Sequence, residues 1–282
     1  MIPVYKIEAQ KAEAKKYIDR VIDIMALSDA GIKDIIRNNA KKLIEKSFSY
    51  KDLGSAFHFS ANEDLDQITT DILRQTQRQI FNAIYMDCYN ADAIAHEKEN
   101  EKHTDKYLLA FLAMQVAGET IEDRISLYAR QFRDEIEAYI AIGISKGLNP
   151  TQILNYYLTF FKNPLASPLI LEAIRKQGYK AEVILQKGNL NKKNKYKSAH
   201  NNLVRLRQDS TMRAYNHAIN SIWLNNQNIA GWYTVRGSSY PCAVCDDHIG
   251  EFHSKDEFFY GWHPRCCCIM LPIYITVLYE TN

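Results

Sequence analysis

Apolar residues along most of the chain recur at intervals of three and four positions, the period of an amphipathic α-helix. The pattern predicts helical segments over Val4–Ser47, Asp64–His96, Thr104–Lys146 and Ser198–Asn226. The first segment is interrupted at Ser28-Asp29-Ala30-Gly31, a sequence suited to capping a second helix. Most of the chain is therefore expected to form long helices, each with one apolar face that packs against its neighbours.

Glycine and proline mark the ends of several of these helices. Gly147 suits the first position after a helix that ends near Lys146, and Asn149-Pro150-Thr151 suits the start of a new helix. A break near Gly118 is expected inside the third segment. The stretch Ser47–Asn62 is aromatic and contains Gly54, so it predicts a loop with a short turn.

The pattern changes near the C-terminus, between Trp232 and Pro272. Aromatic and β-branched residues stand there in short groups, which favour short strands. The predicted fold is mainly α, an irregular bundle of long helices with a small, β-rich module at its end. The expected organisation is a helical domain at 1–180, a basic linker and long helix at 181–230, and the C-terminal module at 231–282.

Composition agrees with a globular protein that has a substantial core. The chain has 282 residues, of which 46% are hydrophobic and 24% charged. A formal net charge of +2 does not by itself imply a nucleic-acid partner. The N-terminus lacks the uninterrupted apolar core of a secretory signal, and no apolar run reaches the ~20 residues of a membrane helix. No membrane association is expected.

The cysteine pattern carries the clearest chemical information. Five of the six cysteines lie in the C-terminal stretch. The order is Cys242-x2-Cys245, an insert of seventeen residues, then His263-x2-Cys266-x-Cys268. Two short groups of paired soft ligands match the needs of a tetrahedral zinc ion. The predicted zinc ligands are Cys242, Cys245, His263 and either Cys266 or Cys268. The small β-rich module at 231–282 is therefore expected to be zinc-bound.

Packing or disulfide formation would be alternative roles for these cysteines. Adjacent Cys266, Cys267 and Cys268 would suit a core as small apolar residues, but packing alone leaves the matching Cys-x2-Cys pair unexplained. Disulfides are disfavoured because the cysteines cluster at ligand spacing in a chain without a secretory signal. Cys88 stands apart from the others and is expected to be an inert packed thiol.

The sequence does not favour an enzyme. Pro241-Cys242-Ala243-Val244-Cys245 matches half of a zinc deaminase signature, but no His-x-Glu or Cys-x-Glu precedes it. No phosphate-binding glycine loop and no Gly-x-Ser-x-Gly elbow is present. Acidic residues and histidines between the two cysteine groups keep a hydrolytic site open: Asp246, Asp247, His248, Glu251 and His253. A cysteine-rich ligand set nevertheless favours a closed, structural site.

The C-terminal stretch resembles phage head morphogenesis proteins, the minor head proteins of the phage Mu type that also occur as prophage genes. The resemblance lies in Cys242-x2-Cys245, the step His248-Ile249-Gly250, the aromatic residues that follow, and the ending His263-Pro264-x-Cys266-x-Cys268. It covers about Arg205 to Pro272 and extends more loosely back to Tyr128. That family usually has an arginine between its last two cysteines, where this chain has Cys267, so the fourth ligand stays open.

This resemblance implies a minor capsid protein that binds the portal or inner capsid components. Such a protein would assist head assembly and DNA packaging or delivery. It would lie in the virion, in the capsid interior or at the portal vertex, and in the cytoplasm of the bacterial host during assembly. Its role would be binding, without catalytic turnover.

A basic run before the last long helix supports a second hypothesis. Seven cations lie between Val183 and Arg207 without one acidic residue: Lys187, Lys192, Lys193, Lys195, Lys197, Arg205 and Arg207. Such a run can neutralise DNA phosphates or bind an acidic protein surface. The alternative function is therefore a zinc-dependent nucleic-acid-binding protein. A solvated hinge would explain the run equally well.

A second group of histidines lies in a charged stretch between two helices. The stretch His96-Glu97-Lys98-Glu99-Asn100-Glu101-Lys102-His103 predicts a linker or an exposed helix end. A histidine flanked by glutamates could bind a metal ion. A solvated connection is the favoured interpretation.

Overall fold

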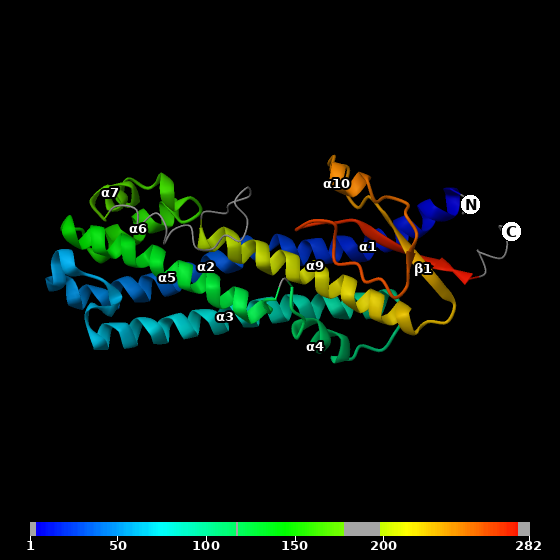
Figure 1. Ribbon diagram of the computed structural model, residues 1–282, viewed down its shortest axis with the longest axis horizontal. Helices are drawn as coiled ribbons and strands as arrows, with labels where there is room; N and C mark the ends of the chain where they lie inside the picture. The colour runs from blue at the N-terminus through cyan, green and yellow to red at the C-terminus, as the bar shows by residue number, and fades with distance from the viewer. Residues whose placement is uncertain (1–3, 117, 178–197, 276–282) are drawn as a thin grey trace. The chain divides into compact units, whose positions relative to one another are not determined.

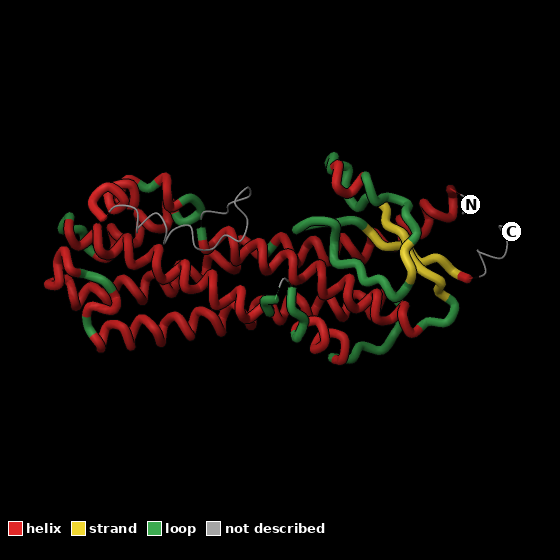
Figure 2. The backbone as a smooth tube through the Cα atoms, viewed as in Figure 1, coloured by secondary structure: helices red, strands yellow, loops and turns green. Residues whose placement is uncertain are grey.

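The computed structural model describes residues 4–116, 118–177 and 198–275 (Figure 1). These residues are mainly helical, with a three-stranded antiparallel sheet near the C-terminus (Figure 2). The predicted fold class is confirmed. Each described helix is either too short or too polar to span a bilayer.

The helices follow the predicted order. They are α1 (Val4–Ala26), α2 (Ser28–Ser47), α3 (Glu63–Lys98), α4 (Lys106–Leu112), α5 (Ile121–Ser145), α6 (Pro150–Phe160), α7 (Pro168–Gln177), α9 (Ala199–Asn225) and α10 (Ala243–Asp246). Short 3-10 turns η1 (Phe48–Ala56), η2 (Phe59–Ala61) and η3 (Pro164–Ala166) connect some of them. The strands are β1 (Ile229–Val235), β2 (His253–Ser254) and β3 (Ile269–Tyr274).

Local sequence signals account for several of the helix ends. Asn149 caps α6, because its side chain accepts from the Gln152 backbone while the Gln152 side chain accepts from the Asn149 backbone. Gly147 has a φ of 70°, as expected for a residue that ends a helix. The predicted break near Gly118 is present as well, since α4 ends at Leu112 and α5 begins at Ile121.

Contacts divide the chain into two compact units that are not consecutive in sequence. Unit 1 comprises Met1–Ser28, Ile84–Val116 and Arg207–Asn282, and unit 2 comprises Asp29–Ala83 and Ala117–Leu206. The sequence predicts three consecutive segments instead. In the structure, α3 and α9 are each divided between the two units. Apolar periodicity could not predict this, because it does not reveal which helices an apolar face contacts.

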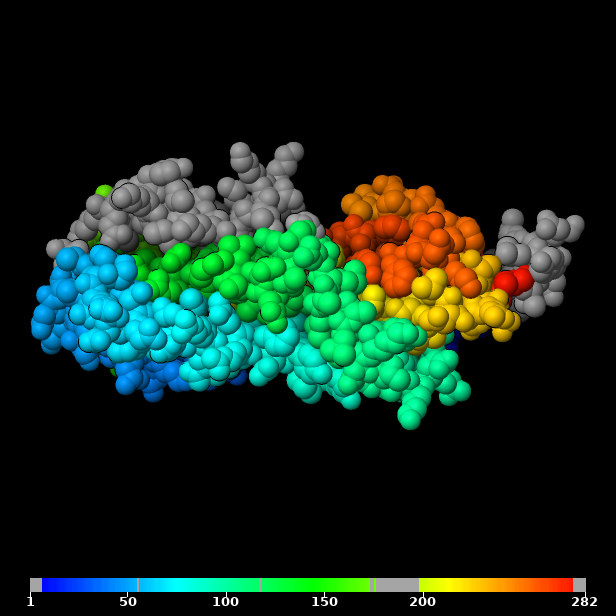
Figure 3. All heavy atoms as spheres, turned by 60° about the horizontal axis from the view of Figure 1, so that its bottom comes forward, coloured from blue at the N-terminus to red at the C-terminus, as the bar shows by residue number. Residues whose placement is uncertain are grey.

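Unit 1 contains one hydrophobic core shared by helices and sheet. Residues of α1, α3 and α9 pack in it with β1, β3 and three of the clustered cysteines. Trp223 of α9 and Trp232 of β1 are both buried there. In the space-filling view, the orange and red atoms of the C-terminal region lie against the yellow atoms of α9 (Figure 3). The C-terminal module is therefore part of a larger core.

Strand β1 is central in the sheet. It pairs antiparallel with β2 on one side and with β3 on the other, in the order β2-β1-β3. Gly231 faces the β2 side so closely that a Cβ there would lie 2.2 Å from the His253 carbonyl oxygen. The Trp232 indole donates to the Glu257 carbonyl at 2.8 Å, which ties the loop after β2 to the sheet.

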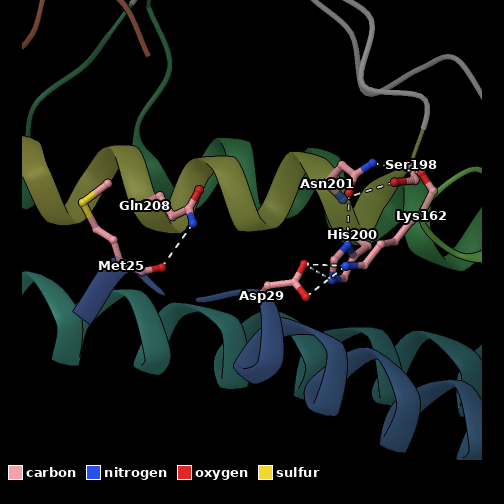
Figure 4. Close-up of polar contacts among 7 residues, drawn as sticks. All are labelled: Met25, Asp29, Lys162, Ser198, His200, Asn201 and Gln208. Atoms are coloured by element: carbon pink, nitrogen blue, oxygen red, sulfur yellow. Dashed lines mark hydrogen bonds and ion pairs between the residues drawn. The ribbon is translucent and has the colours of Figure 1, made fainter. Parts of the chain in front are cut away.

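Unit 2 is built around α5, which packs against α6, α7 and η1. The first turn of α9 joins it through polar contacts drawn in Figure 4. Ser198 caps the helix by accepting from the Asn201 backbone at 3.2 Å, and the Asn201 side chain donates to the Lys162 carbonyl at 2.9 Å. The Lys162 ammonium lies 2.9 Å from an oxygen of Asp29 in α2. Further along α9, inside unit 1, Gln208 donates to the Met25 carbonyl at 3.1 Å.

Candidate metal centre

The first ligand pair lies at the short helix α10. Cys242 is the residue before the helix, and Cys245 lies three positions further on. One helical turn brings residues at this spacing to the same face. The Asp246 backbone donates to the Cys242 carbonyl at 3.0 Å, which closes the turn. Both sulfur atoms can therefore contact a single ion.

The second ligand group lies in a tight turn before β3. The Cys266 backbone donates to the His263 carbonyl at 3.1 Å. Gly261 and Arg265 have φ values of 96° and 63°, the left-handed conformation that reverses the chain here. His263 Nδ1 lies 2.8 Å from the Pro264 carbonyl oxygen, so a proton on Nδ1 leaves Nε2 free to face the cysteines.

The two groups meet. His263 Nε2 lies 3.3 Å from Cys242 Sγ and 3.1 Å from Cys245 Sγ. Cys245 Sγ lies 3.8 Å from Cys266 Sγ. Two thiolates on a tetrahedral zinc ion with Zn–S bonds of about 2.3 Å would stand about 3.8 Å apart. The donor spacing therefore fits an ion of this kind.

All five predicted ligands belong to this cluster. Donor atoms lie within 4.8 Å of one another in two groups that share Cys245: Cys242, Cys245 and His263, and Cys245, Cys266 and Cys268. The neighbouring Cys267 belongs to neither group, and its thiol lies 3.5 Å from the Arg265 carbonyl oxygen. The cluster could hold a metal ion, and Cys267 lies outside it.

The electrostatic environment separates the thiols. A hydrogen bond from the Cys268 side chain lowers the pKa of Cys266 to about 5, against the effect of burial. Burial raises the pKa of Cys245 to about 12. A backbone hydrogen bond from Cys245 lowers the pKa of Cys242. Thiolate is the form that binds a metal. The local contacts favour the thiolate at Cys242 and Cys266 but not at Cys245, so a bound ion would have to displace the proton of Cys245.

No protein-family model matches this chain, and neither a curated protein nor a solved structure matches it. The resemblance of the C-terminal stretch to phage minor head proteins thus stays a prediction from the residues quoted above. The geometry of the cluster stands independently of it.

A glycine holds the second ligand group against the sheet. A Cβ at Gly237, just after β1, would lie 1.7 Å from the Cys267 carbonyl oxygen. No side chain fits in that space, so the backbone between Cys266 and Cys268 can approach β1 only because residue 237 is glycine.

We expect Gly237→Ala to lower the stability of unit 1 by roughly 1–3 kcal/mol, the usual cost of overpacking. It should also weaken metal binding, because Cys266 and Cys268 must move away from β1. Chemical unfolding and a metal competition assay would measure the two effects. Ser238→Ala, at the exposed neighbouring position, is the control and should change neither. An alanine variant that unfolds and binds metal like the parent would show that this close approach is unimportant.

The histidines between the two groups have other partners. His248 Nδ1 lies 3.0 Å from a Glu251 oxygen, and the His248 ring stacks on Trp262 with centroids 4.0 Å apart. His253 Nδ1 lies 3.0 Å from a Glu257 oxygen, and its ring stacks on Trp232. These contacts stabilise the loop beside the sheet. Neither histidine belongs to a metal-binding group among the described residues.

The basic run is only partly covered by the structure. Lys187, Lys192, Lys193, Lys195 and Lys197 lie outside the described residues. Arg205 and Arg207 lie on α9. The Arg207 guanidinium is buried and contacts both carboxylate oxygens of Asp87, at 2.6 and 3.0 Å. The sequence predicts a basic, solvent-facing run that includes Arg207. That prediction is wrong for Arg207, because its guanidinium is buried in this ion pair.

The stretch at the end of α3 differs from its predicted solvated state. Asp92 and His96 are buried, and His103 lies beside them. The sequence signal was the spacing Asp92-x3-His96, which places both side chains on one face of a helix. The glutamates and lysines that follow His96 predict a solvent-exposed segment, and this prediction outweighed the signal from the spacing.

Proposed function

We propose that the protein is a phage or prophage minor head protein, which binds portal or inner capsid components and contains a structural zinc site. The observation that carries the proposal is the convergence of Cys242, Cys245, His263, Cys266 and Cys268 in one cluster. These are the residues on which the resemblance to that family rests. Sulfur and imidazole donors at tetrahedral spacing suit zinc better than they suit magnesium or calcium.

The zinc ion would have a mechanical role. The cysteine cluster belongs to the same core as α1 and α9, so an ion there fixes the sheet and the α10 turn on the helices. Two exposed apolar side chains lie at the first ligand pair: Tyr240, two positions before Cys242, is 79% exposed, and Val244, between the two cysteines, is 47% exposed. A turn held rigid by the ion would present these two side chains to a partner at little entropic cost.

A binding experiment with a surface variant tests this proposal. The portal and major capsid proteins encoded in the same genome would be tested for co-purification with the full chain. We expect Tyr240→Ser with Val244→Ser to weaken the complex at least tenfold and to leave zinc content and folding unchanged. Leu27→Ser, which also removes an exposed apolar side chain, should bind like the parent.

Two results would overturn the proposal. Absence of binding to any head component would remove the assignment. Binding to DNA that falls steeply with salt, without a protein partner, would support the zinc-dependent nucleic-acid-binding alternative instead. Deleting the module from Trp232 onward is a poorer test, because β1 and β3 belong to the core of unit 1 and their loss would unfold it.

A further inference from the structure

A group of side chains that could hold a metal ion lies at the end of α3, away in sequence from the C-terminal cysteine cluster. Asp92 and His96 are four positions apart on the helix, so they share one face. After the helix, Asn100 adopts a left-handed φ of 55°, and the Glu101 backbone donates to the His96 carbonyl at 2.9 Å. This turn reverses the chain and returns His103 to the same face.

Nitrogen and oxygen atoms of the three side chains converge. One donor atom from each of Asp92, His96 and His103 lies within 4.8 Å of the other two. Asp92 Oδ2 is 3.2 Å from His96 Nδ1 and 3.0 Å from His103 Nε2. Two imidazoles and one carboxylate form a ligand set that binds divalent transition metals such as zinc and iron, with coordination positions left open.

The carboxylate lacks the hydrogen bonds that its burial requires. Asp92 is 1% and His96 2% exposed. Among the described residues, neither carboxylate oxygen of Asp92 has a hydrogen bond of good geometry, and the contact from His103 Nε2 is an ion pair at 3.0 Å. The short distances to Asp92 are thus not matched by hydrogen-bond angles. Burial raises the pKa of Asp92, while the two histidines oppose that change. A bound cation would satisfy all three groups at once.

Neighbouring aromatic rings fix the two imidazoles. His103 meets the Tyr89 ring edge to face, with centroids 4.9 Å apart, and His96 stacks on Tyr107 at 5.6 Å. His96 Nδ1 also lies 2.9 Å from the Asp92 carbonyl oxygen. This contact also holds the His96 ring with Nδ1 facing Asp92.

One of the three residues borders a pocket. This pocket of about 440 Å³ is lined by His96, by Lys102 and Thr104 of the connecting turn, and by Asn225 at the end of α9. Asp92 and His103 do not line it, and the His103 side chain is 25% exposed. Water could occupy the open coordination positions of an ion held by the three side chains.

We propose that Asp92, His96 and His103 bind a divalent transition-metal ion, at a second metal site separate from the cysteine cluster. A metal-free Asp–His ion pair is the simpler arrangement of the same residues. In that arrangement the short contacts between Asp92 and the two histidines lack good hydrogen-bond angles in a buried position, which is unusual in a native structure.

Metal stoichiometry and cobalt spectroscopy on the full chain distinguish the two arrangements. We expect the parent to bind two equivalents of Zn²⁺ or Co²⁺. Cobalt at the cysteine cluster would give strong thiolate-to-metal charge-transfer absorption, whereas cobalt at Asp92 would add only weak ligand-field bands. His103→Ala should remove the second equivalent and its weak bands while the thiolate absorption stays. The affinity loss should exceed the roughly 10–100-fold that follows loss of an outer-shell partner.

Two further variants keep the result interpretable. Asp92→Asn preserves the size of the side chain and removes its charge, so it should also lose the second equivalent. His58→Ala, at an exposed histidine of unit 2, should keep both equivalents. The proposal would be overturned if the parent bound only the thiolate-dependent equivalent, or if His103→Ala retained both. Failure of the cysteine site would instead remove the charge-transfer absorption, and the two failures are therefore distinct.

Discussion

Cys245→Ser should abolish metal binding at the cysteine cluster and destabilise unit 1 by several kcal/mol. Cys245 belongs to both donor groups of the cluster, so its loss removes a donor from each. A structural zinc ion contributes on the order of 10 kcal/mol to the folding of small zinc-dependent peptides. The loss should be smaller here than in such peptides, because unit 1 is also stabilised by an extensive hydrophobic core.

The chain offers a spectroscopic means to observe this effect. All three tryptophans, Trp223, Trp232 and Trp262, lie in unit 1. Urea unfolding followed by tryptophan fluorescence therefore reports unit 1, whereas circular dichroism reports helices of both units. We expect the fluorescence transition of Cys245→Ser to move to lower urea concentration. Chelator should move the parent transition in the same direction, and by more than it moves the variant, which keeps Asp92, His96 and His103.

Cys267→Ser is the matched control. It removes a thiol one position from the cluster without removing a donor. Its metal content and fluorescence transition should equal those of the parent. If Cys245→Ser and Cys267→Ser behaved alike, the cluster would be a packed group of small apolar side chains, the simpler arrangement that the sequence also allows.

The sequence predicted which cysteines and which histidine come together, because the residues within each ligand group are local. Cys242 and Cys245 are joined by one helical turn, and His263 and Cys266 by one backbone hydrogen bond. Spacing within a turn determines such geometry, so short motifs carry the information. The helices were predictable for a similar reason, since their apolar period and their capping residues are local signals.

The long-range arrangement could not be predicted in the same way. Arg207 appears in the sequence as one cation of a basic run, yet it pairs with Asp87, which lies 120 positions earlier. His96 stands beside glutamate and lysine, yet it is buried between Asp92 and Tyr107. Both errors have one cause. A run of charged residues predicts solvent exposure only when no distant part of the chain packs against it. For Arg207 and His96, a distant part of the chain does pack against them.

A buried glutamate in unit 2 leads to a prediction about pH. Glu135 of α5 is completely buried. Its Oε1 accepts from the Ala199 backbone at 2.8 Å and from Gln131 Nε2 at 3.1 Å, and Oε2 has no hydrogen-bond partner among the described residues. Burial raises the pKa of Glu135 to about 8, although the hydrogen bond from Ala199 opposes the shift and the charge of Asp134 adds to it.

The sign of the effect follows from proton binding. In the unfolded chain the carboxyl has its ordinary pKa of 4.5, and in the folded protein its pKa is about 8. Between these values the folded state holds a proton that the unfolded state has lost. The contribution to stability is therefore fully present below pH 4.5 and is lost as the pH rises to about 8. Each pKa unit corresponds to about 1.4 kcal/mol, so the total is of the order of a few kcal/mol.

Glu135→Gln should remove this dependence, because glutamine keeps the accepting oxygen and has no proton to lose. We expect the variant to resemble the parent near pH 5 and to be more stable than the parent, by a few kcal/mol at most, near pH 8. Urea unfolding of both proteins by circular dichroism across that range gives the difference, in which titration of other groups cancels. Glu122→Gln, at an exposed position of the same helix, should follow the parent at every pH. Parallel curves for the parent and Glu135→Gln would mean that Glu135 does not hold a proton in the folded state.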